Sequence, residues 1–154
     1  MFKTPAALFR VFAIAEAVTW TLLITGLILR AVADLPLAVV IGGSIHGFVF
    51  LCYGATAILV AKNNRWSPGP FTLAVGSAII PYLTIPVEVW LHRTNRLAGA
   101  WRLAETDDPR DRTWHDRVMR FFLVRPVLLG GLGVVAVAVI FTVLVIIGPP
   151  GGRA

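Results

Sequence analysis

Four polar side chains lie inside long apolar stretches of this sequence, where each would have to leave water: Glu16, His46, Tyr82 and Glu88. An ionisable group costs roughly 2.5–3.5 kcal/mol at the centre of a membrane helix, so such residues mark either a function or a specific contact. One hypothesis is a proton relay or small-ligand pocket built from the four. The other is that each satisfies a neighbouring helix, and the shortness of the spans favours this one.

The predicted helix boundaries place Glu16 and His46 about two turns into neighbouring antiparallel helices, entered from opposite sides. A rise of about 1.5 Å per residue then separates them by roughly 10 Å along the axis. A direct pair would need boundaries shifted by one turn. A carboxyl group alone in hydrocarbon must be neutral or find a partner. Tyr82 is expected near the depth of His46, and Glu88 closer to the interface.

A membrane enzyme is a third alternative, and Glu88, His92 and His115 are the residues that could serve it. The chain between them is long and flexible, which makes a converging site the weakest hypothesis. The sequence contains no nucleotide-binding loop and no cluster with metal-ligand spacing. We therefore expect a protein that is not an enzyme and that carries no cofactor and no metal.

Small residues suggest where helices pack closely. Gly43 and Gly47 form a GxxxG pair beside His46, and Gly54 follows on roughly the same stripe. Gly130 and Gly133 would permit a similar approach early in the last apolar stretch. GxxxG serves contacts within one chain as well as dimerisation. The sequence predicts helix packing at these five glycines without choosing between the two.

The composition requires a lipid environment. Hydrophobic residues make up 57% of the chain and charged residues 14%, against about 25% charged in a typical soluble domain. Mean hydropathy is +0.80. The net charge of +6 does not indicate nucleic acid, because eight arginines share one segment with five acidic residues between apolar runs. Cys52 is the sole cysteine, so no disulfide forms within the chain.

Four apolar stretches are long enough to cross a bilayer, which needs about 20 residues. They cover residues 8–32, 37–60, 71–91 and 124–147, and the third contains Pro81 and Pro86. We expect an all-α membrane protein, a four-helix transmembrane bundle with both ends on one side. Its parts would be a three-helix core over 1–93, a linker over 94–123, a fourth span over 124–148 and a tail over 149–154.

The linker carries its own helix signal. Thr113 followed by Asp116 resembles a capping box, and Trp114, Val118 and Phe121 recur at helical spacing. This pattern predicts an interfacial amphipathic helix before the last span. The segment 97–103 with its tryptophan could lie on the membrane in the same way. The alternative is a solvated linker whose aromatic residues are incidental.

Charge counts suggest an orientation. With four spans, one side holds five Lys and Arg residues and the other holds nine, most of them in the linker. The positive-inside rule then favours a cytoplasmic linker over residues 92–123 with both termini outside. The basic residues of the N-terminal segment and of the 61–70 loop pull the other way.

Several short motifs occur in a familiar order: Arg10, then Glu16, then Gly43-Ser-Ile-His-Gly47, then Arg65-Trp66, then Ile80-Pro-Tyr82 and the exit from Glu88 to Arg93. In this order the chain resembles the bacterial integral-membrane family known as domain of unknown function 3817, over about residues 9–93. The resemblance implies a membrane location and brings no catalytic residues. Its matching positions here are Arg10, Glu16, His46, Gly47 and Pro81.

The expected function follows from these features. The short loops, glycine stripes and lack of a convincing site favour a non-enzymatic accessory or scaffold subunit, or a homo-oligomer, of the cell membrane. Its partners would be the lipid bilayer and either another membrane protein or a second copy, and not nucleic acid. The alternative is a small transporter or proton-coupled carrier that uses Glu16 and His46.

Overall fold

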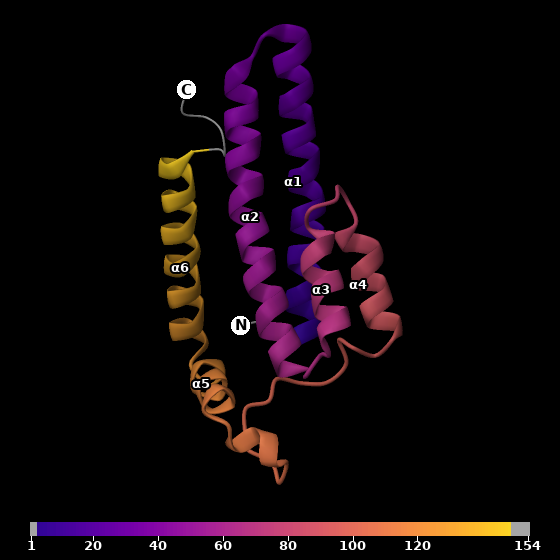
Figure 1. The fold of residues 1–154 in the computed structure, drawn as a ribbon, viewed down its shortest axis with the longest axis vertical. Coiled ribbons are helices and arrows are strands. Elements are labelled where there is room, and N and C mark those ends of the chain that lie inside the picture. The colour runs from indigo at the N-terminus through magenta and orange to yellow at the C-terminus, as the bar shows by residue number, and fades with distance from the viewer. Residues whose placement is uncertain (1–2, 149–154) are drawn as a thin grey trace.

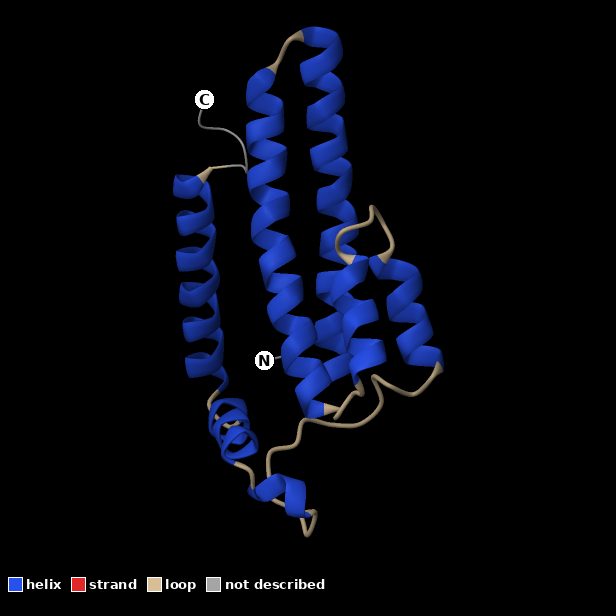
Figure 2. Ribbon diagram, viewed as in Figure 1, coloured by secondary structure: helices blue, strands red, loops and turns tan. Residues whose placement is uncertain are grey.

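The computed structural model describes residues 3–148, and every regular element in that range is helical (Figures 1 and 2). The elements in chain order are α1 (Pro5–Ala33), α2 (Pro36–Asn63), α3 (Pro68–Ser77), α4 (Thr84–Arg93), the 3₁₀ helix η1 (Pro109–Arg112), α5 (Trp114–Leu123) and α6 (Pro126–Ile147). The all-α prediction is confirmed. The C-terminal tail over 149–154 lies outside the described residues.

Three of these helices, α1, α2 and α6, are long and apolar enough to cross a membrane. Each has proline in its first turn, where the missing N–H costs no helical hydrogen bond. Thr4 caps α1 by accepting from the Ala7 N–H at 3.1 Å. Asp34 ends α1 in a left-handed conformation with φ 51°, so α2 returns beside α1 as a tall antiparallel pair (Figure 1).

The predicted continuous helix over 71–91 is wrong. Its place is taken by two ten-residue helices, α3 and α4, which lie side by side and are joined by a turn over 78–83 (Figure 1). Pro81 lacks an N–H and restricts the residue before it, and Tyr82 takes a left-handed φ of 65°. Pro86 is tolerated because it falls in the first turn of α4.

The two short helices form a helical hairpin, and neither of them has the length to cross a bilayer. A ten-residue helix is about 15 Å long, half of the roughly 30 Å hydrocarbon core. The chain leaves α4 at the same end of the bundle where it entered α3 (Figure 1). Among the described residues the structure therefore has three full-length candidate spans and not four. In Figure 1 α1 begins in the lower part of the bundle and α6 ends beside the upper part of α2, which differs from the expectation of both ends on one side.

Packing differs along the length of the bundle. In the lower half, α3 contacts α2 and α4 contacts α1, around a core whose fully buried members include Phe9, Tyr53, Val60 and Leu91. In the upper half the hairpin is absent, α6 packs on α2, and α1 and α2 face each other directly. There they touch backbone to backbone: a Cβ added to Gly26 would lie 2.6 Å from the Ala38 carbonyl oxygen, and one added to Gly42 would lie 2.7 Å from that of Leu22.

The glycines that the sequence singled out are placed differently. A Cβ at Gly43 or Gly47 would make an ordinary contact, with Leu23 at 3.7 Å and Phe141 at 3.5 Å. Added at Gly54, Gly130 or Gly133, it would meet nothing within 4 Å among the described residues. The tightest helix contact thus comes from Gly26 and Gly42, which lie outside the GxxxG pair.

The linker folds back onto the bundle instead of lying on the membrane throughout. Leu97 and Trp101 are buried against the core, and residues 97–103 form no helix. A helix does follow, α5, and Thr113 is its N-cap residue. The Thr113 hydroxyl donates to the Asp116 carboxylate at 2.9 Å instead of accepting a backbone N–H, so the capping box is incomplete. The stripe of Trp114, Val118 and Phe121 is exposed, while Met119 and Leu123 face the protein.

Candidate functional site

Glu16 and His46 meet inside the bundle. Glu16 is fully buried, and one of its carboxyl oxygens lies 3.9 Å from His46 Nδ1. Neither carboxyl oxygen has a hydrogen-bond partner among the described residues. The Thr19 hydroxyl donates to the Glu16 carbonyl at 3.0 Å and lies 3.2 Å from His46 Nδ1. Since that hydroxyl has a single proton, this geometry favours a protonated Nδ1 that donates to Thr19.

The close approach of Glu16 and His46 differs from the expected separation of roughly 10 Å along the axis. The expectation took the register of the two helices from the predicted ends of the apolar stretches. The Gly26 and Gly42 contacts set it instead, and they slide α2 so that His46 lies level with Thr19. Glu16 is then one turn away, within reach of the imidazole.

Polar groups of α1 and α2 hold the hairpin in place. The Trp20 indole, which also packs on His46 with ring centroids 4.4 Å apart, donates to the Ala78 carbonyl at 3.3 Å. The Tyr53 hydroxyl donates to the Ala74 carbonyl at 2.9 Å. In return, the Thr84 hydroxyl donates to the Ala13 carbonyl at 3.0 Å. The first two bonds satisfy carbonyls at the end of α3, which hydrocarbon could not do, and the third ties α4 to α1.

Tyr82 and Glu88 do not join the Glu16–His46 pair. The Tyr82 hydroxyl lies 3.4 Å from that of Thr21, at the turn of the hairpin. Glu88 is buried and forms an ion pair with Arg10 at 2.9 Å, tying α4 to the start of α1. His92 ends α4, whereas His115 lies in α5 against Trp114. The four predicted residues therefore divide into one buried pair and two separate hairpin contacts.

The tip of the hairpin, residues 79–82, is exposed. Ile79 is 68% exposed, Ile80 53% and Tyr82 45%. Three backbone groups there, the Ile79 carbonyl, the Pro81 carbonyl and the Tyr82 N–H, have no hydrogen bond to any described residue. Irregular backbone at membrane depth is tolerated where protein buries it or where it lines a water-filled cavity, but not against lipid. At membrane depth the tip would therefore require a neighbour other than lipid.

A second polar cluster lies at the linker end of the bundle, the end formed by the α2–α3 connection, the C-terminus of α4 and residues 94–113. Asp111 is its centre and is 1% exposed. Its carboxylate accepts from the Arg65 guanidinium, from Arg102 at 2.8 Å and from the Thr106 hydroxyl at 2.6 Å. Arg120 donates to the Asp111 carbonyl at 2.6 Å. This network joins the linker to both α2 and α5.

The same contacts shift the ionisation of the acidic residues. Hydrogen bonds from Thr106 and the nearby Arg65 guanidinium outweigh burial and lower the pKa of Asp111 to about 2. Hydrogen bonds from Arg110 lower the pKa of Asp108 well below its usual range. Burial opposes ionisation of Asp116, but Thr113, Lys62 and Arg102 together still lower its pKa. All three carboxyl groups therefore stay ionised at neutral pH.

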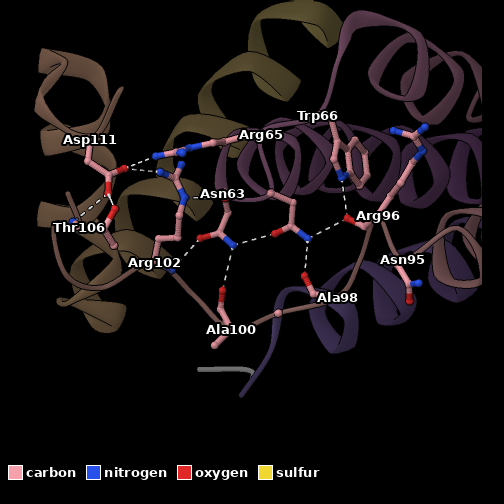
Figure 3. Close-up of a pocket in the computed structure, with 12 residues that line it drawn as sticks. Asn63, Arg65, Trp66, Asn95, Arg96, Ala98, Ala100, Arg102, Thr106 and Asp111 are labelled. Atoms are coloured by element: carbon pink, nitrogen blue, oxygen red, sulfur yellow. Dashed lines mark hydrogen bonds and ion pairs between the residues drawn. The ribbon is translucent and has the colours of Figure 1, made fainter. Parts of the chain in front are cut away.

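Side chains from the end of α2 fix the first part of the linker around a pocket of about 560 Å³ (Figure 3). Asn63 donates to the Ala100 carbonyl at 3.2 Å and Asn64 to the Arg96 carbonyl at 2.8 Å. Arg102 in turn caps α2 by donating to the Lys62 and Asn63 carbonyls. Figure 3 shows Asp111, Arg65 and Arg102 at one end of the pocket and Trp66, Arg96 and Asn95 at the other.

Several of these residues were not predicted from the sequence. Thr19 stands three residues after Glu16 on the same helix face, a spacing that could have identified it. Trp20 stands in the middle of an apolar stretch, where no neighbouring residue marks it; it packs on His46 and also donates a hydrogen bond to the hairpin. Asp111 could not be identified from the sequence, because no local feature shows which of the linker's acidic residues becomes buried.

An all-helical chain with three long apolar helices and a polar interior defines a multi-pass membrane protein. The model of a family described as a domain of unknown function (DUF3817) matches residues 6–93, and this chain belongs to that family. The match covers α1 to α4, that is, the tall pair and the hairpin, and it confirms the resemblance seen in the motifs.

One relative is a protein of Streptomyces coelicolor (strain A3(2)) that is named as a membrane protein, SCO5905. It is 39% identical over 87 residues, which are 55% of this chain and 10% of that protein. The present chain thus spans about a tenth of the length of its relative. No solved structure matches this chain.

Proposed function

We propose that this chain is a non-enzymatic accessory subunit of the cell membrane, and that the tip of its re-entrant hairpin docks against a transmembrane helix of a larger membrane protein. The observation that carries the proposal is the exposed tip over residues 79–82 with its three unpaired backbone groups. A partner helix that offers a hydroxyl or amide side chain would satisfy them and exclude lipid.

The rest of the hairpin supports docking because it is rigid. It is fixed on α1 and α2 by the bonds of Trp20, Tyr53 and Thr84 and by the Arg10–Glu88 ion pair. The tip is therefore held in place before any partner arrives, which lowers the entropic cost of binding.

The architecture of the relative supports a partner larger than this chain. In SCO5905 the matched segment is 10% of the protein, so the related sequence is joined there to a much longer chain. A segment that is part of a large membrane protein in one bacterium can be a separate chain in another bacterium and associate there with such a protein. We favour such a partner over a second copy of this chain for that reason.

Orientation follows from the hairpin. With three crossings, twelve of the fourteen Lys and Arg residues fall at the linker end: Lys3, Arg10, Lys62, Arg65, Arg93, Arg96, Arg102, Arg110, Arg112, Arg117, Arg120 and Arg125. Arg30 falls at the opposite end, and Arg153 lies outside the described residues. The positive-inside rule then puts the N-terminus and the linker in the cytoplasm. The basic residues of the N-terminal segment and of the 61–70 loop opposed the four-span orientation. With three crossings they lie on the same side as the linker and support its cytoplasmic placement.

The exposed stripe of α5 fits this placement. Trp114, Val118 and Phe121 point away from the protein at the linker end, and Arg117 is exposed beside them. In our proposal the stripe lies on the cytoplasmic surface of the membrane, with the basic side chains among the lipid headgroups. α6 then serves as an anchor beside α2.

Photo-crosslinking at the tip tests the docking proposal. A photoreactive residue at Ile80, in membranes of the native host, is expected to give one discrete adduct heavier than two copies of this chain. The matched control is Ile58 of α2, which is similarly exposed at 58% and lies away from the tip. A homodimer-sized adduct from Ile80 would contradict a separate partner, and adducts with lipid alone would contradict docking altogether.

A second candidate function has one observation in its favour. The Glu16–His46 pair lies beside Trp20, whose indole bonds the end of α3, so a water-filled cavity around the tip would reach close to a buried carboxyl group. This arrangement suits a proton-coupled carrier. Cysteine in place of Tyr82, in a Cys52→Ala background, tests it. Rapid reaction with a small water-soluble maleimide would support the carrier, and protection would oppose it.

A further inference from the structure

Among the arginines of this pocket, Arg96 is the one whose guanidinium group is not bound to an acceptor in the described part of the chain. The Arg65 guanidinium is bound to Asp108 and Asp111, and that of Arg102 to Asp111, Asp116 and the end of α2. Arg96, by contrast, makes no hydrogen bond or ion pair through its guanidinium with any described residue, and its Nε is buried. The side chain as a whole is half-exposed, but an N–H donor buried without an acceptor is costly, so its Nε is placed to meet one from outside the chain.

The backbone that presents Arg96 is firmly fixed. Its N–H donates to the Leu91 carbonyl at 2.9 Å, and its carbonyl accepts from the Trp66 indole at 2.7 Å and from Asn64 at 2.8 Å. Trp66 itself packs on the fully buried Phe9, with ring centroids 5.9 Å apart. The side chain is held as well, since its guanidinium carbon lies 5.5 Å from the centroid of the Trp90 ring.

The location of the pocket indicates which kind of acceptor the Arg96 guanidinium binds. Arg96 follows α4 by three residues, so it lies at the level of the lipid headgroups once the hairpin starts and ends at the interface. A guanidinium group binds phosphate through two parallel N–H donors. The exposed side chain of Asn95, whose own backbone has a φ of 55°, is at the same end of the pocket and can supply a further donor (Figure 3).

We propose that this end of the pocket is a phosphate-binding site in which Arg96 holds the phosphate and Asn95 assists. Two sources carry that chemistry: the phosphodiester of an anionic glycerophospholipid, and free phosphate or a phosphate monoester from the aqueous side. Carboxylates of the chain itself do not compete, because Asp108, Asp111 and Asp116 are bound by Arg65, Arg102, Arg110 and Lys62.

Thermal unfolding of the full chain in detergent tests this proposal. The probes are dioleoyl phosphatidylglycerol, dioleoyl phosphatidylcholine and inorganic phosphate, each titrated separately at constant ionic strength. The site predicts a saturable rise of several degrees in Tm with phosphatidylglycerol, and a much smaller one with phosphatidylcholine. A saturable rise with inorganic phosphate would assign the site to a soluble phosphate instead.

Matched variants separate the pocket from the general basic charge of this end. Arg96→Gln is expected to abolish most of the Tm rise, and Arg96→Lys to retain part of it. Arg93→Gln removes the same charge from an exposed residue at the end of α4 and should leave the rise intact. Because the Arg96 side chain makes no internal hydrogen bond, its variants should fold. Equal losses in Arg96→Gln and Arg93→Gln, or no saturable rise with either phosphate probe, would overturn the proposal.

Discussion

At the scale of single residues, Asp111 determines whether the linker stays folded on the bundle. Replacing it with asparagine removes the charge that three arginines share and leaves them partly unpaired in a buried setting. We expect Asp111→Asn to speed tryptic cleavage within residues 94–112 by roughly tenfold or more, because the linker opens more often. Asp107→Asn, a change at an exposed neighbour, should leave the cleavage rate unchanged. An unaltered rate in Asp111→Asn would show that the network does not hold the linker.

The same carboxyl group predicts how the linker responds to acid. The pKa of Asp111 is about 2 in the folded chain against an ordinary value of 3.8, so its ionised form favours the docked linker. This contribution is fully present above about pH 5 and is lost as the pH falls through 4 towards 2. Pepsin cleavage of the linker should therefore rise steeply below pH 4. In Asp111→Asn the rise should be smaller, and an equally steep rise would refute the assignment.

Glu16 predicts a contrast between two substitutions. Its carboxyl group is fully buried without a hydrogen bond, so it is either neutral or paired with the imidazole of His46. Glu16→Gln keeps the shape and should cost less than about 1 kcal/mol if the group is neutral, while Glu16→Ala opens a cavity and should cost about 2–3 kcal/mol. Chemical unfolding in mixed micelles measures both. Equal large losses would indicate an ion pair with His46.

At the scale of helices, the register of α1 against α2 depends on two glycines. Gly26→Val would drive a side chain into the Ala38 carbonyl, which lies 2.6 Å from the Cβ position, and overpacking of this kind costs about 1–3 kcal/mol or more. Gly54→Ala has open space and a better helix former, so it should raise stability by up to roughly 1 kcal/mol. Thermal unfolding of the two variants should shift in opposite directions. A neutral Gly26→Val would contradict the close contact.

Much of the helical architecture could be predicted from the sequence, and the reasons are physical. The apolar lengths of α1, α2 and α6 and the capping residue of α5 are local properties. The hairpin could not be predicted in the same way, because α3 and α4 together have the length and apolar character of one span. Pro81 indicated a break there, but the left-handed backbone of Tyr82 that turns the chain back is set by packing.

The candidate site was predicted in part for the same reason. Burial inside apolar stretches identified Glu16 and His46, since ionisable residues there need a partner. Their contact depends on a register that the distant pair Gly26 and Gly42 sets, which no local spacing reveals. Thus the residue types were predictable, and the pairing was not.

At the scale of the whole molecule, the hairpin decides which segments share a side of the membrane. Ser67, between α2 and α3, and Asp107, in the linker, lie at the same end of the structure because α4 returns the chain to where α3 began. A full-length third span would separate them. The orientation, the docking of the tip and the location of the Arg96 pocket all depend on this single feature.

Cysteine accessibility in intact cells tests the hairpin topology most directly. Single cysteines at Ala33, Ser67 and Asp107, in a Cys52→Ala background, would be treated with a membrane-impermeant maleimide before and after permeabilisation; all three positions are exposed. We predict that Ala33→Cys reacts in intact cells, and that Ser67→Cys and Asp107→Cys react together, after permeabilisation alone. Reaction of Ser67→Cys and Asp107→Cys from opposite sides would contradict the re-entrant hairpin and restore a four-span topology.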